Sequence, residues 1–496
     1  MTGMPPSVPV RRLPELVAGF AAAPDITVSD LTLDSRQVGA GTVFLACRGT
    51  RQHGLDFLPQ ALAAGAGALL WEPAPGIVAP DVAIPALPVE GLSRRVGEIA
   101  ARFFGHPSQA LHVVGITGTD GKTSTAWLVA QALEALGEPC LYVGTLGAGR
   151  VGQLTPGDHT TPDPVNLQRR LHLARQEHLR VVAMEVSSHA LDQARVAGIA
   201  FHTAVLTNVG RDHLDYHGTL ENYAAAKHRL FREFALKAAV LNHDDAHGRD
   251  WAALLLREAS RVRVSRYGLE AGAELAARNV ELAPTGIAFD VQAPPGQARI
   301  ESRLLGRFNV YNLLAALGVL LAKGVALERA CAALSQAGTV PGRIEGFRGP
   351  AARPLVVVDY AHTPQALAQV LQAVRAHCTG TLWCVFGCGG DRDRGKRPLM
   401  GAAAARNADQ LIVTDDNPRS EDPAAIVRGI QAGFPAGLKA RVIHDRARAI
   451  ETAVGAAAAD DVVVVAGKGH EDYQLYGRER RSFSDRAFAA QLTGQR

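Results

Sequence analysis

The chain has 496 residues, of which 47% are hydrophobic and 20% charged, with a formal net charge of +4. This length predicts about three domains, and the small, unclustered positive charge leads us to expect no nucleic-acid partner. No apolar run reaches the ~20 residues of a membrane span, the N-terminus lacks a secretion signal, and scattered cysteines without a disulfide-like framework fit a reducing cytoplasm.

The first predicted domain, residues 1–107, is of the α/β class. Short strand-like runs occupy residues 31–38, 42–47 and 67–72, and a helix is predicted over residues 91–104. The sequence GHPS that follows interrupts this pattern, so we place a domain boundary there.

The second predicted domain, residues 108–342, alternates apolar strands with helical stretches. Its strands are predicted at residues 111–117, 140–146, 180–186, 203–209 and 238–243. Continuous apolar strands separated by helices predict a parallel sheet that is covered on both faces. After Arg261, shorter alternating runs predict a small antiparallel insert, and helices are expected from Asn309 and from Leu327.

The third predicted domain, residues 343–496, begins after the linker-like sequence VPGR. Its strands are predicted at residues 355–361, 382–390, 411–418, 441–445 and 462–469. The renewed alternation of strands and helices predicts a separate Rossmann-like, doubly wound domain. The whole chain is therefore predicted to be an α/β protein of three domains in series.

The sequence GITGTDGKTST, residues 115–125, has the composition of a phosphate-binding loop. The strict pattern asks for a glycine five places before the Gly-Lys pair, and Ile116 stands there instead. A strand precedes the loop and a helix is predicted to begin near Lys122, which is the context that such a loop requires. Lys122 would neutralise the phosphates and Thr123 would bind Mg²⁺; the alternative is an ordinary tight turn.

Two more polar sequences follow strands of the second domain, AMEVSSHAL and LTNVGRDHLDYHG. Ligands of doubly wound sheets bind at the carboxyl ends of the strands, so Glu185 and His213 are candidates for a Mg²⁺ site near Thr123. A structural ion pair is the alternative for Glu185. Lys227 lies on a predicted helix, and from the residue pattern alone it is interpreted as a solvated helix lysine.

Polar side chains also gather at the strand exits of the third domain. They are Asp359, His362, Arg392, Asn417, Arg419, His470 and Glu471. Arginine guanidinium groups suit carboxylates, and Glu471 would hold an ammonium group. This combination predicts a pocket for a small zwitterion with more than one carboxylate. A metal site at Cys384 and Cys388 is disfavoured, because no second Cys/His pair accompanies them.

Ten sequences, taken in chain order, resemble the signature of the Mur ligases. They are GITGTDGKTST, TTPDP, MEVSSHAL, TNVGRDHLDYHG, GRFNVYN, PGRIE, DYAHTP, GCGGDRDRGKRP, DNPR and GKGHE. These enzymes are ATP-dependent amino acid ligases of peptidoglycan precursor synthesis, and the resemblance covers almost the whole chain. It is strongest to the members that join meso-diaminopimelate to UDP-MurNAc-L-Ala-D-Glu through an acyl phosphate.

The resemblance implies roles for individual residues. The implied catalytic residues are Lys122, Glu185, Lys227 and His213. The implied ATP site contains Gly118, Thr119, Asp120, Gly121, Lys122, Thr123, Ser124, Asn309, Asn312, Arg343 and Asp359. The implied UDP-MurNAc-dipeptide site contains Leu33, Ser35, Thr50, Arg51, Gln52, His159, Thr160, Thr161, Ser187, Gln193 and Arg195. The implied diaminopimelate site contains Arg392, Asp416, Asn417, Pro418, Arg419, Gly467 and Glu471.

The resemblance also implies that Lys227 is carbamylated to N6-carboxylysine and joins Thr123, Glu185 and His213 around Mg²⁺. This replaces the interpretation of Lys227 as a solvated lysine. Diaminopimelate has one more carboxylate than lysine, which Arg419 can pair bidentately. Leaving Arg419 unpaired is penalised, so this residue is expected to discriminate against lysine.

Two residues depart from the family's usual loop, in which Asn and Thr stand where this chain has Asp120 and Ser124. Asp120 either weakens ATP binding through its charge or points away from the phosphates, and we expect activity to survive. The alternatives are a lysine-adding Mur ligase, a folylpolyglutamate synthetase-like ligase, and a nucleotide-dependent switch, which would not explain the third-domain cluster. We expect a cytoplasmic monomer.

Overall fold

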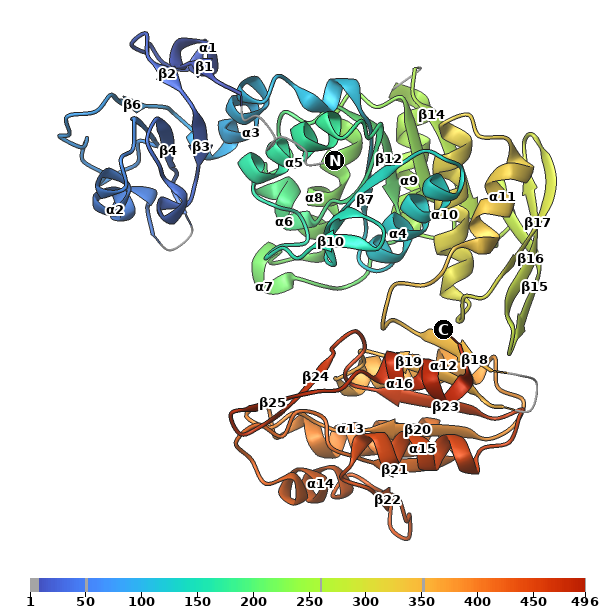
Figure 1. The fold of residues 1–496 in the computed structure, drawn as a ribbon. Helices are drawn as coiled ribbons and strands as arrows, with labels where there is room; N and C mark the ends of the chain where they lie inside the picture. Colours follow the sequence, from blue (N-terminus) through green and yellow to red (C-terminus); the bar gives the residue numbers. More distant parts are fainter. Residues whose placement is uncertain (1–8, 50–51, 259–260, 350–352, 496) are drawn as a thin grey trace, which may run out of the picture. The chain divides into compact units, whose positions relative to one another are not determined.

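The computed structural model describes residues 9–49, 52–258, 261–349 and 353–495 (Figure 1). The chain divides into two compact units. The first contains Met1–Leu275 and Ala315–Ala326, and the second contains Ala276–Leu314 and Leu327–Arg496.

The first unit begins with a four-stranded parallel sheet. Across the sheet its strands are β3 (Asp30–Thr32), β4 (Thr42–Ala46), β5 (Ala68–Trp71) and β6 (Ala86–Pro88). The accompanying elements are the antiparallel pair β1 (Arg11–Arg12) and β2 (Thr27–Val28), and helices α1 (Leu13–Val17), α2 (Leu58–Ala63) and α3 (Leu92–Phe103). The α/β prediction for this part of the chain is confirmed.

The strand predicted over residues 31–38 is wrong in its second half. Strand β3 ends at Thr32, and Ser35–Gln37 form a 3₁₀ turn. The Asp34 carboxylate accepts a hydrogen bond from the Arg36 backbone N–H at 3.0 Å. Aspartate side chains that bond to nearby backbone compete in this way with strand pairing. Two other 3₁₀ turns occupy Gly54–Phe57 and Pro107–Ala110.

A larger, mostly parallel sheet forms the centre of the first unit. Its parallel strands, in spatial order, are β8 (Cys140–Gly144), β11 (Val181–Glu185), β7 (His112–Thr117), β12 (Phe201–Leu206), β13 (Ala238–Asn242) and β14 (Arg263–Gly268). Beside β8 lie the antiparallel strands β9 (Gly147–Arg150) and β10 (Gln153–Thr155). The helices are α4 (Lys122–Ala135), α5 (Pro164–Gln176), α6 (Ser188–Asp192), α7 (Leu214–His217), α8 (Leu220–Arg232) and α9 (Ala246–Glu258).

The second unit contains the predicted antiparallel insert, formed by β15 (Leu275–Ala283), β16 (Gly286–Ala293) and β17 (Gly296–Ser302). Its six-stranded sheet has the spatial order β18 (Glu345–Arg348), β19 (Leu355–Asp359), β23 (Val462–Ala466), β20 (Leu382–Phe386), β21 (Gln410–Val413) and β22 (Arg441–Val442). All neighbours in this sheet are parallel except β18 and β19. Strands β24 (Tyr473–Tyr476) and β25 (Glu479–Ser482) form a hairpin.

The remaining helices confirm two predicted starting points. Helix α10 (Phe308–Ala322) begins one residue before Asn309, and α11 (Leu327–Gln336) begins at Leu327. The others are α12 (Pro364–Arg375), α13 (Lys396–Asn407), α14 (Pro423–Gln431), α15 (Arg446–Ala456) and α16 (Asp485–Thr493).

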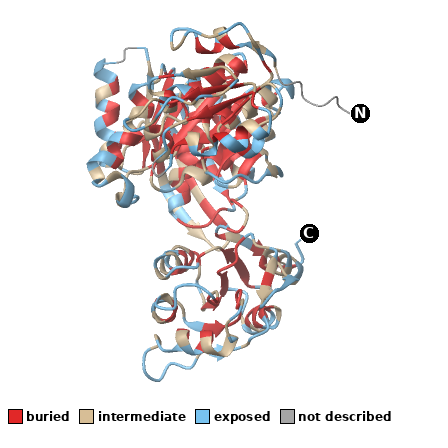
Figure 2. Ribbon diagram, turned by 90° about the vertical axis from the view of Figure 1, so that its left-hand side faces the viewer, coloured by how far each residue is buried: buried red, intermediate tan, exposed pale blue. Residues whose placement is uncertain are grey.

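The strands that were predicted from apolar runs are buried on both faces. All residues of β8, β11, β19, β20 and β23 are buried, and Figure 2 shows the buried residues concentrated in the sheets. Strands of this kind have no polar face, which is why parallel sheets are covered by helices on both sides. The polar groups that carry chemistry must therefore lie at the strand ends.

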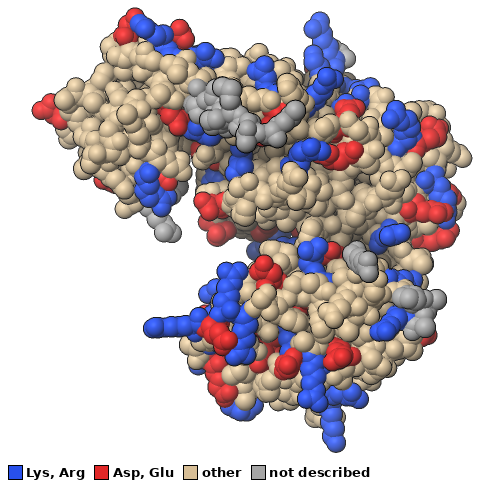
Figure 3. All heavy atoms as spheres, viewed as in Figure 1, with Lys and Arg blue, Asp and Glu red and all other residues tan. Residues whose placement is uncertain are grey.

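On the face of the molecule in Figure 3, acidic and basic side chains are interspersed over both units. The net charge of +4 is thus not collected into one patch on that face. Among the described residues, no helix combines the length and the apolar composition that crossing a membrane requires.

A fully buried ion pair lies under the strand ends of the second unit. Arg446 and Asp485, the first residues of α15 and α16, both have side chains with 0% exposure. The guanidinium donates to both Asp485 carboxylate oxygens at 2.7 Å. It also donates to the carbonyl oxygens of Asp415 at 3.3 Å and Ala466 at 3.0 Å. One arginine therefore joins two helices to the ends of β21 and β23.

Replacing Asp485 by Asn is expected to destabilise the second unit by about 3–5 kcal/mol, because it leaves a buried guanidinium without its hydrogen-bonded counter-charge. The measurement is urea unfolding followed by tryptophan fluorescence. The control is Asp290→Asn, which removes a carboxylate from the exposed cluster around Arg299. This control should leave the midpoint nearly unchanged. Equal urea midpoints for the two variants would contradict a stabilising role for the pair of Arg446 and Asp485.

Candidate active site

The loop between β7 and α4 has a backbone that glycine alone can form at Gly118. Its φ of +152° lies where L side chains are rare, and an added Cβ would collide with the Thr207 hydroxyl. The loop is held in place from the end of β12. The Thr119 N–H donates to the Asn208 carbonyl at 2.9 Å, and the Asp120 N–H donates to the Asn208 side chain at 3.0 Å. The predicted phosphate loop is thus a fixed structure at the carboxyl end of the sheet.

Lys122, the first residue of α4, folds back over this loop. Its ammonium donates to the carbonyl oxygens of Gly118 at 2.9 Å and Thr119 at 2.8 Å. Burial lowers the pKa of Lys122, while the charge of Glu185 opposes that effect. The cation and the amino end of a helix are therefore both at the loop, as the binding of a phosphate requires.

Lys227 is buried, and its interpretation as a solvated helix lysine is wrong. The residue is 1% exposed, and its amine donates to the same Gly118 carbonyl at 2.7 Å. The amine lies 4.3 Å from the centre of the Tyr223 ring. Burial, and then the charge of Lys122, lower the pKa of Lys227 to about 6. Most of this amine is neutral at pH 7, and the neutral amine is the form that reacts with CO₂.

Glu185 ends strand β11 with a fully buried carboxylate. One oxygen accepts hydrogen bonds from the Tyr142 hydroxyl at 2.7 Å and the Thr145 N–H at 2.8 Å. The other accepts from the Thr123 hydroxyl at 2.8 Å and the Thr145 hydroxyl at 3.3 Å. Gly144 leaves room for this arrangement, since a Cβ there would overlap both Glu185 and Tyr142. Four donors therefore fix the carboxylate beside Thr123.

The structure joins Thr123 to Glu185 and Lys227 to the loop, but gives His213 a different partner. His213 is half-exposed, and its ring lies 3.3 Å from the Asp212 carboxylate. Within the described part of the chain, no three His, Cys, Asp or Glu side chains have the spacing of a metal site. Mg²⁺ is commonly bound through one or two carboxylates, with phosphate oxygens and water as further ligands. The oxygen atoms of Thr123 and Glu185 fit that role.

Asp120, which departs from the family's usual loop, has an exposed side chain. Its charge raises the pKa values of both Lys122 and Lys227, so the carboxylate acts on both amines of the loop. Its backbone carbonyl accepts a hydrogen bond from the Thr207 hydroxyl at 2.6 Å. Ser124 follows Thr123 in the first turn of α4.

The residues expected to hold the dipeptide form a connected group near Glu185. The Thr161 hydroxyl donates to the Glu185 backbone carbonyl at 2.9 Å and accepts from the Ser187 N–H at 3.2 Å. Arg195 donates to the Thr161 carbonyl at 3.2 Å and, through two nitrogen atoms, to the Gln193 side chain. Thr160 lies 3.1 Å from Thr145 between hydroxyl oxygens, and His159 is exposed.

The residues expected to hold the uridine nucleotide lie in the amino-terminal sheet region. The Ser35 hydroxyl donates to the Gln60 side chain at 2.7 Å. Leu33 packs against the core of this region, and Gln52 is exposed. Thr50 and Arg51 lie outside the described residues.

In the second unit, a cavity of about 500 Å³ lies at the strand ends. Its lining includes six residues predicted from sequence: Arg392, Asp416, Asn417, Arg419, Gly467 and Glu471. The seventh, Pro418, is buried and adjacent in sequence. His362 also lines the cavity. Most residues of the predicted strand-exit cluster therefore line a single cavity, whereas Asp359 and His470 are not among its lining residues.

The polar groups of this cavity are fixed to different degrees. Asn417 donates to the Glu471 carboxylate at 3.0 Å, and the fully buried Lys468 donates to that carboxylate at 2.9 Å. Arg419 has a positive φ of 52° and donates through one nitrogen to the Gly390 carbonyl at 2.7 Å. Asp416 is 8% exposed. Guanidinium, carboxylate and amide groups thus face one volume.

The remaining predicted ATP residues also belong to the second unit. Asn309 and Asn312 are buried on α10 and joined by a side-chain hydrogen bond of 2.8 Å. Asp359 accepts from the N–H groups of Ile344 at 2.8 Å and Ala361 at 2.6 Å. Burial raises the pKa of Asp359. The Arg343 guanidinium lies 5.2 Å from the centre of the Tyr360 ring.

Sequence reasoning missed several residues that the structure places at these sites. Tyr142 and Thr145 hold Glu185, and Lys468 holds Glu471. Thr145 follows β8, whose carboxyl end lies at the same sheet edge as Glu185, so its position was a usable signal. Tyr142 lies inside an apolar strand, where nothing in the sequence distinguishes it from a core residue.

Three family models match the chain. The model of the Mur ligase family catalytic domain matches residues 27–104, the Mur ligase middle domain matches residues 116–320, and the Mur ligase glutamate ligase domain matches residues 342–469.

Two similar curated proteins carry the name UDP-N-acetylmuramoyl-L-alanyl-D-glutamate–2,6-diaminopimelate ligase. The protein of Alkalilimnicola ehrlichii is 51% identical, covering 95% of this chain and 96% of its own length. That of Ectopseudomonas mendocina is 49% identical, covering 94% and 95%. A solved structure of a ligase with this name is 36% identical, with a TM-score of 0.78, and covers 98% of this chain and 99% of its own.

Replacing Lys227 by Met is expected to raise the unfolding temperature at pH 7, on the order of 3 °C. The ordinary lysine pKa of 10.5 falls to about 6 in the folded state. Between those pH values the unfolded chain binds more protons, so this lysine destabilises the fold increasingly as pH decreases. Gly118 keeps its hydrogen bond from Lys122.

The measurement is thermal unfolding in CO₂-depleted buffer at pH 7 and pH 10, where the gain should shrink. The exposed Lys237, changed to Met, is the control and should show no such pH dependence. A lower unfolding temperature for the Lys227 variant at pH 7 would contradict the burial argument.

Proposed function

Since this chain belongs to the Mur ligase family, we propose that it joins meso-diaminopimelate to UDP-MurNAc-L-Ala-D-Glu in an ATP-dependent reaction of peptidoglycan precursor synthesis. The single observation that supports this most directly is the second-unit cavity, where Arg392, Arg419 and Glu471 face one volume. Guanidinium forks pair with carboxylates, and a carboxylate pairs with an ammonium. A substrate with two carboxylates and two ammonium groups uses all of these.

The reaction begins with transfer of the γ-phosphoryl group of ATP to the D-glutamate γ-carboxylate, which gives an acyl phosphate. The amine of diaminopimelate then attacks the acyl carbon, and the C–O bond to phosphate breaks as the amide forms. The protein supplies mainly positioning and charge neutralisation in such transfers. Lys122 supplies the cation at the phosphate loop, where it already lies over two carbonyl oxygens.

Thr123, Glu185, carbamylated Lys227 and His213 are the proposed Mg²⁺ ligands. Bound Mg²⁺ would neutralise charge on the phosphate oxygens. Glu185 contributes a carboxylate that four donors already orient. The low pKa of Lys227 favours carbamylation, since its amine is largely neutral at pH 7.

Binding of the substrates is assigned to groups of residues. Gln193, Arg195, Ser187 and the residues 159–161 are proposed to hold the muramoyl dipeptide, with Leu33, Ser35 and the residues 50–52 at the uridine nucleotide. Asn309, Asn312, Arg343 and Asp359 are proposed for the ATP base and ribose.

We further propose a cytoplasmic monomer with domains at residues 1–107, 108–342 and 343–496. Free thiols at all six cysteines agree with a reducing compartment.

The direct test is phosphate release from ATP with UDP-MurNAc-L-Ala-D-Glu and one of three additions: meso-diaminopimelate, L-lysine or no amino acid. Only diaminopimelate is expected to give rapid release with formation of the tripeptide. Lys122→Ala should lower the rate by about 100–1000-fold, because it removes a preorganised cation from the transferring phosphoryl group. Amino-acid-independent hydrolysis by the wild type would instead favour a nucleotide-dependent switch.

Arg419→Ala is expected to lower kcat/KM for diaminopimelate by about 100-fold, the loss that follows when one partner of a buried charge pair is removed. Activity with L-lysine should change little, since lysine lacks the carboxylate that Arg419 would pair. The control is Arg428→Ala, an exposed arginine of α14. Stimulation of the wild type by lysine alone would refute the role of Arg419 and favour a lysine-adding ligase.

A further inference from the structure

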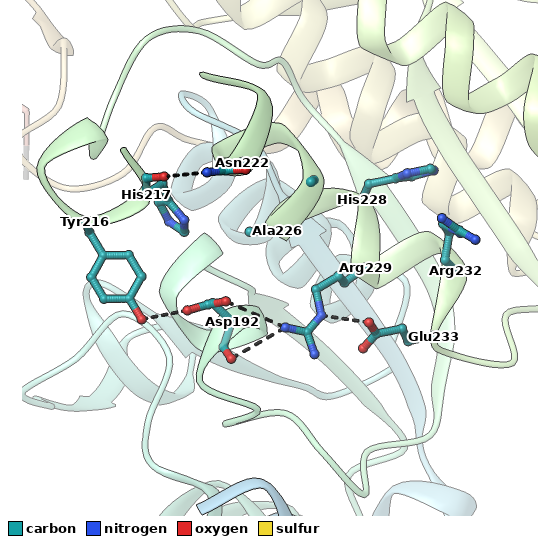
Figure 4. Close-up of a pocket in the computed structure, with 10 residues that line it drawn as sticks. Asp192, Tyr216, His217, Asn222, Ala226, His228, Arg229, Arg232 and Glu233 are labelled. Carbon is teal, nitrogen blue, oxygen red and sulfur yellow. Dashed lines mark hydrogen bonds and ion pairs between the residues drawn. The ribbon is translucent and has the colours of Figure 1, made fainter. Parts of the chain in front are cut away.

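A continuous chain of polar contacts connects the dipeptide residues to helix α8. Gln193 donates through its amide nitrogen to the Tyr216 hydroxyl at 3.2 Å, and that hydroxyl donates to the Asp192 carboxylate at 2.7 Å. Asp192 lies 3.8 Å from the Arg229 guanidinium, which donates to Glu233 at 2.8 Å. Figure 4 shows the last four of these residues in a row, joined by their contacts.

The other end of this chain reaches the sheet. Both bonds from Arg195 to Gln193 end on the Gln193 side-chain oxygen, at 2.9 and 2.6 Å. Arg195 also donates to the Thr161 carbonyl, and the Thr161 hydroxyl is bonded to the end of β11. The side-chain oxygen and nitrogen of Gln193 are therefore both engaged, so its orientation is determined by Arg195 on one side and Tyr216 on the other.

The backbone between Gln193 and Arg195 is unusual. Ala194 has a φ of +52°, a left-handed conformation that L residues other than Asn and Asp rarely adopt. The turn is closed by hydrogen bonds from the Ala194 N–H to Leu191 at 3.3 Å and from the Arg195 N–H to Ala190 at 2.8 Å. Such strain persists where the surroundings determine the conformation, and it is frequent at functional sites. Here the left-handed conformation of Ala194 places the side chains of Gln193 and Arg195 beside one another.

Packing alone does not hold Tyr216. Tyr216 is 37% exposed, and together with Asp192 and Arg229 it lines an open cavity of about 880 Å³. Its ring contacts the imidazoles of His189 and His217, at 4.3 and 4.8 Å between centres. Tyr216 lines the cavity and is partly exposed, and its hydroxyl is oriented by the bonds to Gln193 and Asp192.

We propose that Tyr216 and Asp192 are positioning residues for UDP-MurNAc-L-Ala-D-Glu, and that they act through Gln193 and Arg195. This proposal rests on the assignment of Gln193 and Arg195 to the muramoyl dipeptide under the proposed function. Asp192 fixes the Tyr216 hydroxyl proton, which leaves the hydroxyl oxygen free to accept from Gln193. The Gln193 side-chain oxygen is then held toward Arg195. Arg229 links the same carboxylate to α8, the helix that carries Lys227.

The test compares Tyr216→Phe, Asp192→Asn and the double variant in the complete enzyme. Tyr216→Phe keeps the ring against the two imidazoles and removes the hydroxyl alone. KM for UDP-MurNAc-L-Ala-D-Glu should rise about tenfold, the effect of losing one or two hydrogen bonds. KM for ATP and for diaminopimelate should change by less than about twofold. The double variant should resemble the single ones, because both changes interrupt one chain.

The matched control is Tyr267→Phe. Its hydroxyl also donates a hydrogen bond, to the Leu206 backbone carbonyl at 3.0 Å, but it lies in the buried core and has no bond to Gln193 or Asp192 among those of the described residues. This variant should lose thermal stability without a selective change in KM for UDP-MurNAc-L-Ala-D-Glu. Unchanged KM in Tyr216→Phe, or equal loss for all three substrates, would overturn the proposal. Failure of the wild type to use UDP-MurNAc-L-Ala-D-Glu would instead refute the proposed function.

Discussion

The active-site region of the first unit depends on one backbone carbonyl, that of Gly118, which accepts hydrogen bonds from two lysines. Lys122 and Lys227 donate to it at 2.9 and 2.7 Å. Two ammonium groups this close in a buried place repel one another, and the charge of Lys122 adds to burial in lowering the pKa of Lys227. The loop thus holds two amines against one carbonyl oxygen, and burial lowers the pKa of both. Glycine at position 118 is required for this geometry, because a side chain there would collide with Thr207.

The phosphate-loop region of the first unit and the cavity of the second unit both contain carboxylates that are already held by hydrogen bonds. The cavity also contains an arginine that keeps donors available for a ligand. Glu185 accepts four hydrogen bonds and Glu471 accepts two, so each carboxylate has a defined orientation before any ligand arrives. Arg419 makes one side-chain bond, to the Gly390 carbonyl, which aims its planar fork without using all of its donors. Preorganisation of this kind lowers the entropy cost of holding charged ligands.

The sequence predicted the buried central strands, the insert and the loop, because apolar runs and glycine positions report local structure. It did not predict the shorter, less apolar strands β9, β10, β24 and β25. The strand predicted over residues 31–38 is wrong in its second half, where the Asp34 side chain accepts a hydrogen bond from the Arg36 backbone and a 3₁₀ turn forms instead. Lys227 could not be interpreted from its own helix, since its burial results from a contact with Gly118, 109 positions away in sequence. Likewise, the role of Tyr142 depends on which strands are neighbours in the sheet, which its own strand does not encode.

The buried pair of Arg446 and Asp485 has a consequence for how the protein is made. The two residues are 39 positions apart in sequence, and between them lies β23, whose last carbonyl Arg446 also binds. On the ribosome, Arg446 emerges well before Asp485, the carboxylate to which it is hydrogen-bonded, has been synthesised. Closing the central strands of the second unit over this guanidinium before α16 arrives would bury it without that partner. A nascent chain stalled before that helix would hold an open, hydrated sheet edge, which is the kind of intermediate that chaperones and proteases recognise.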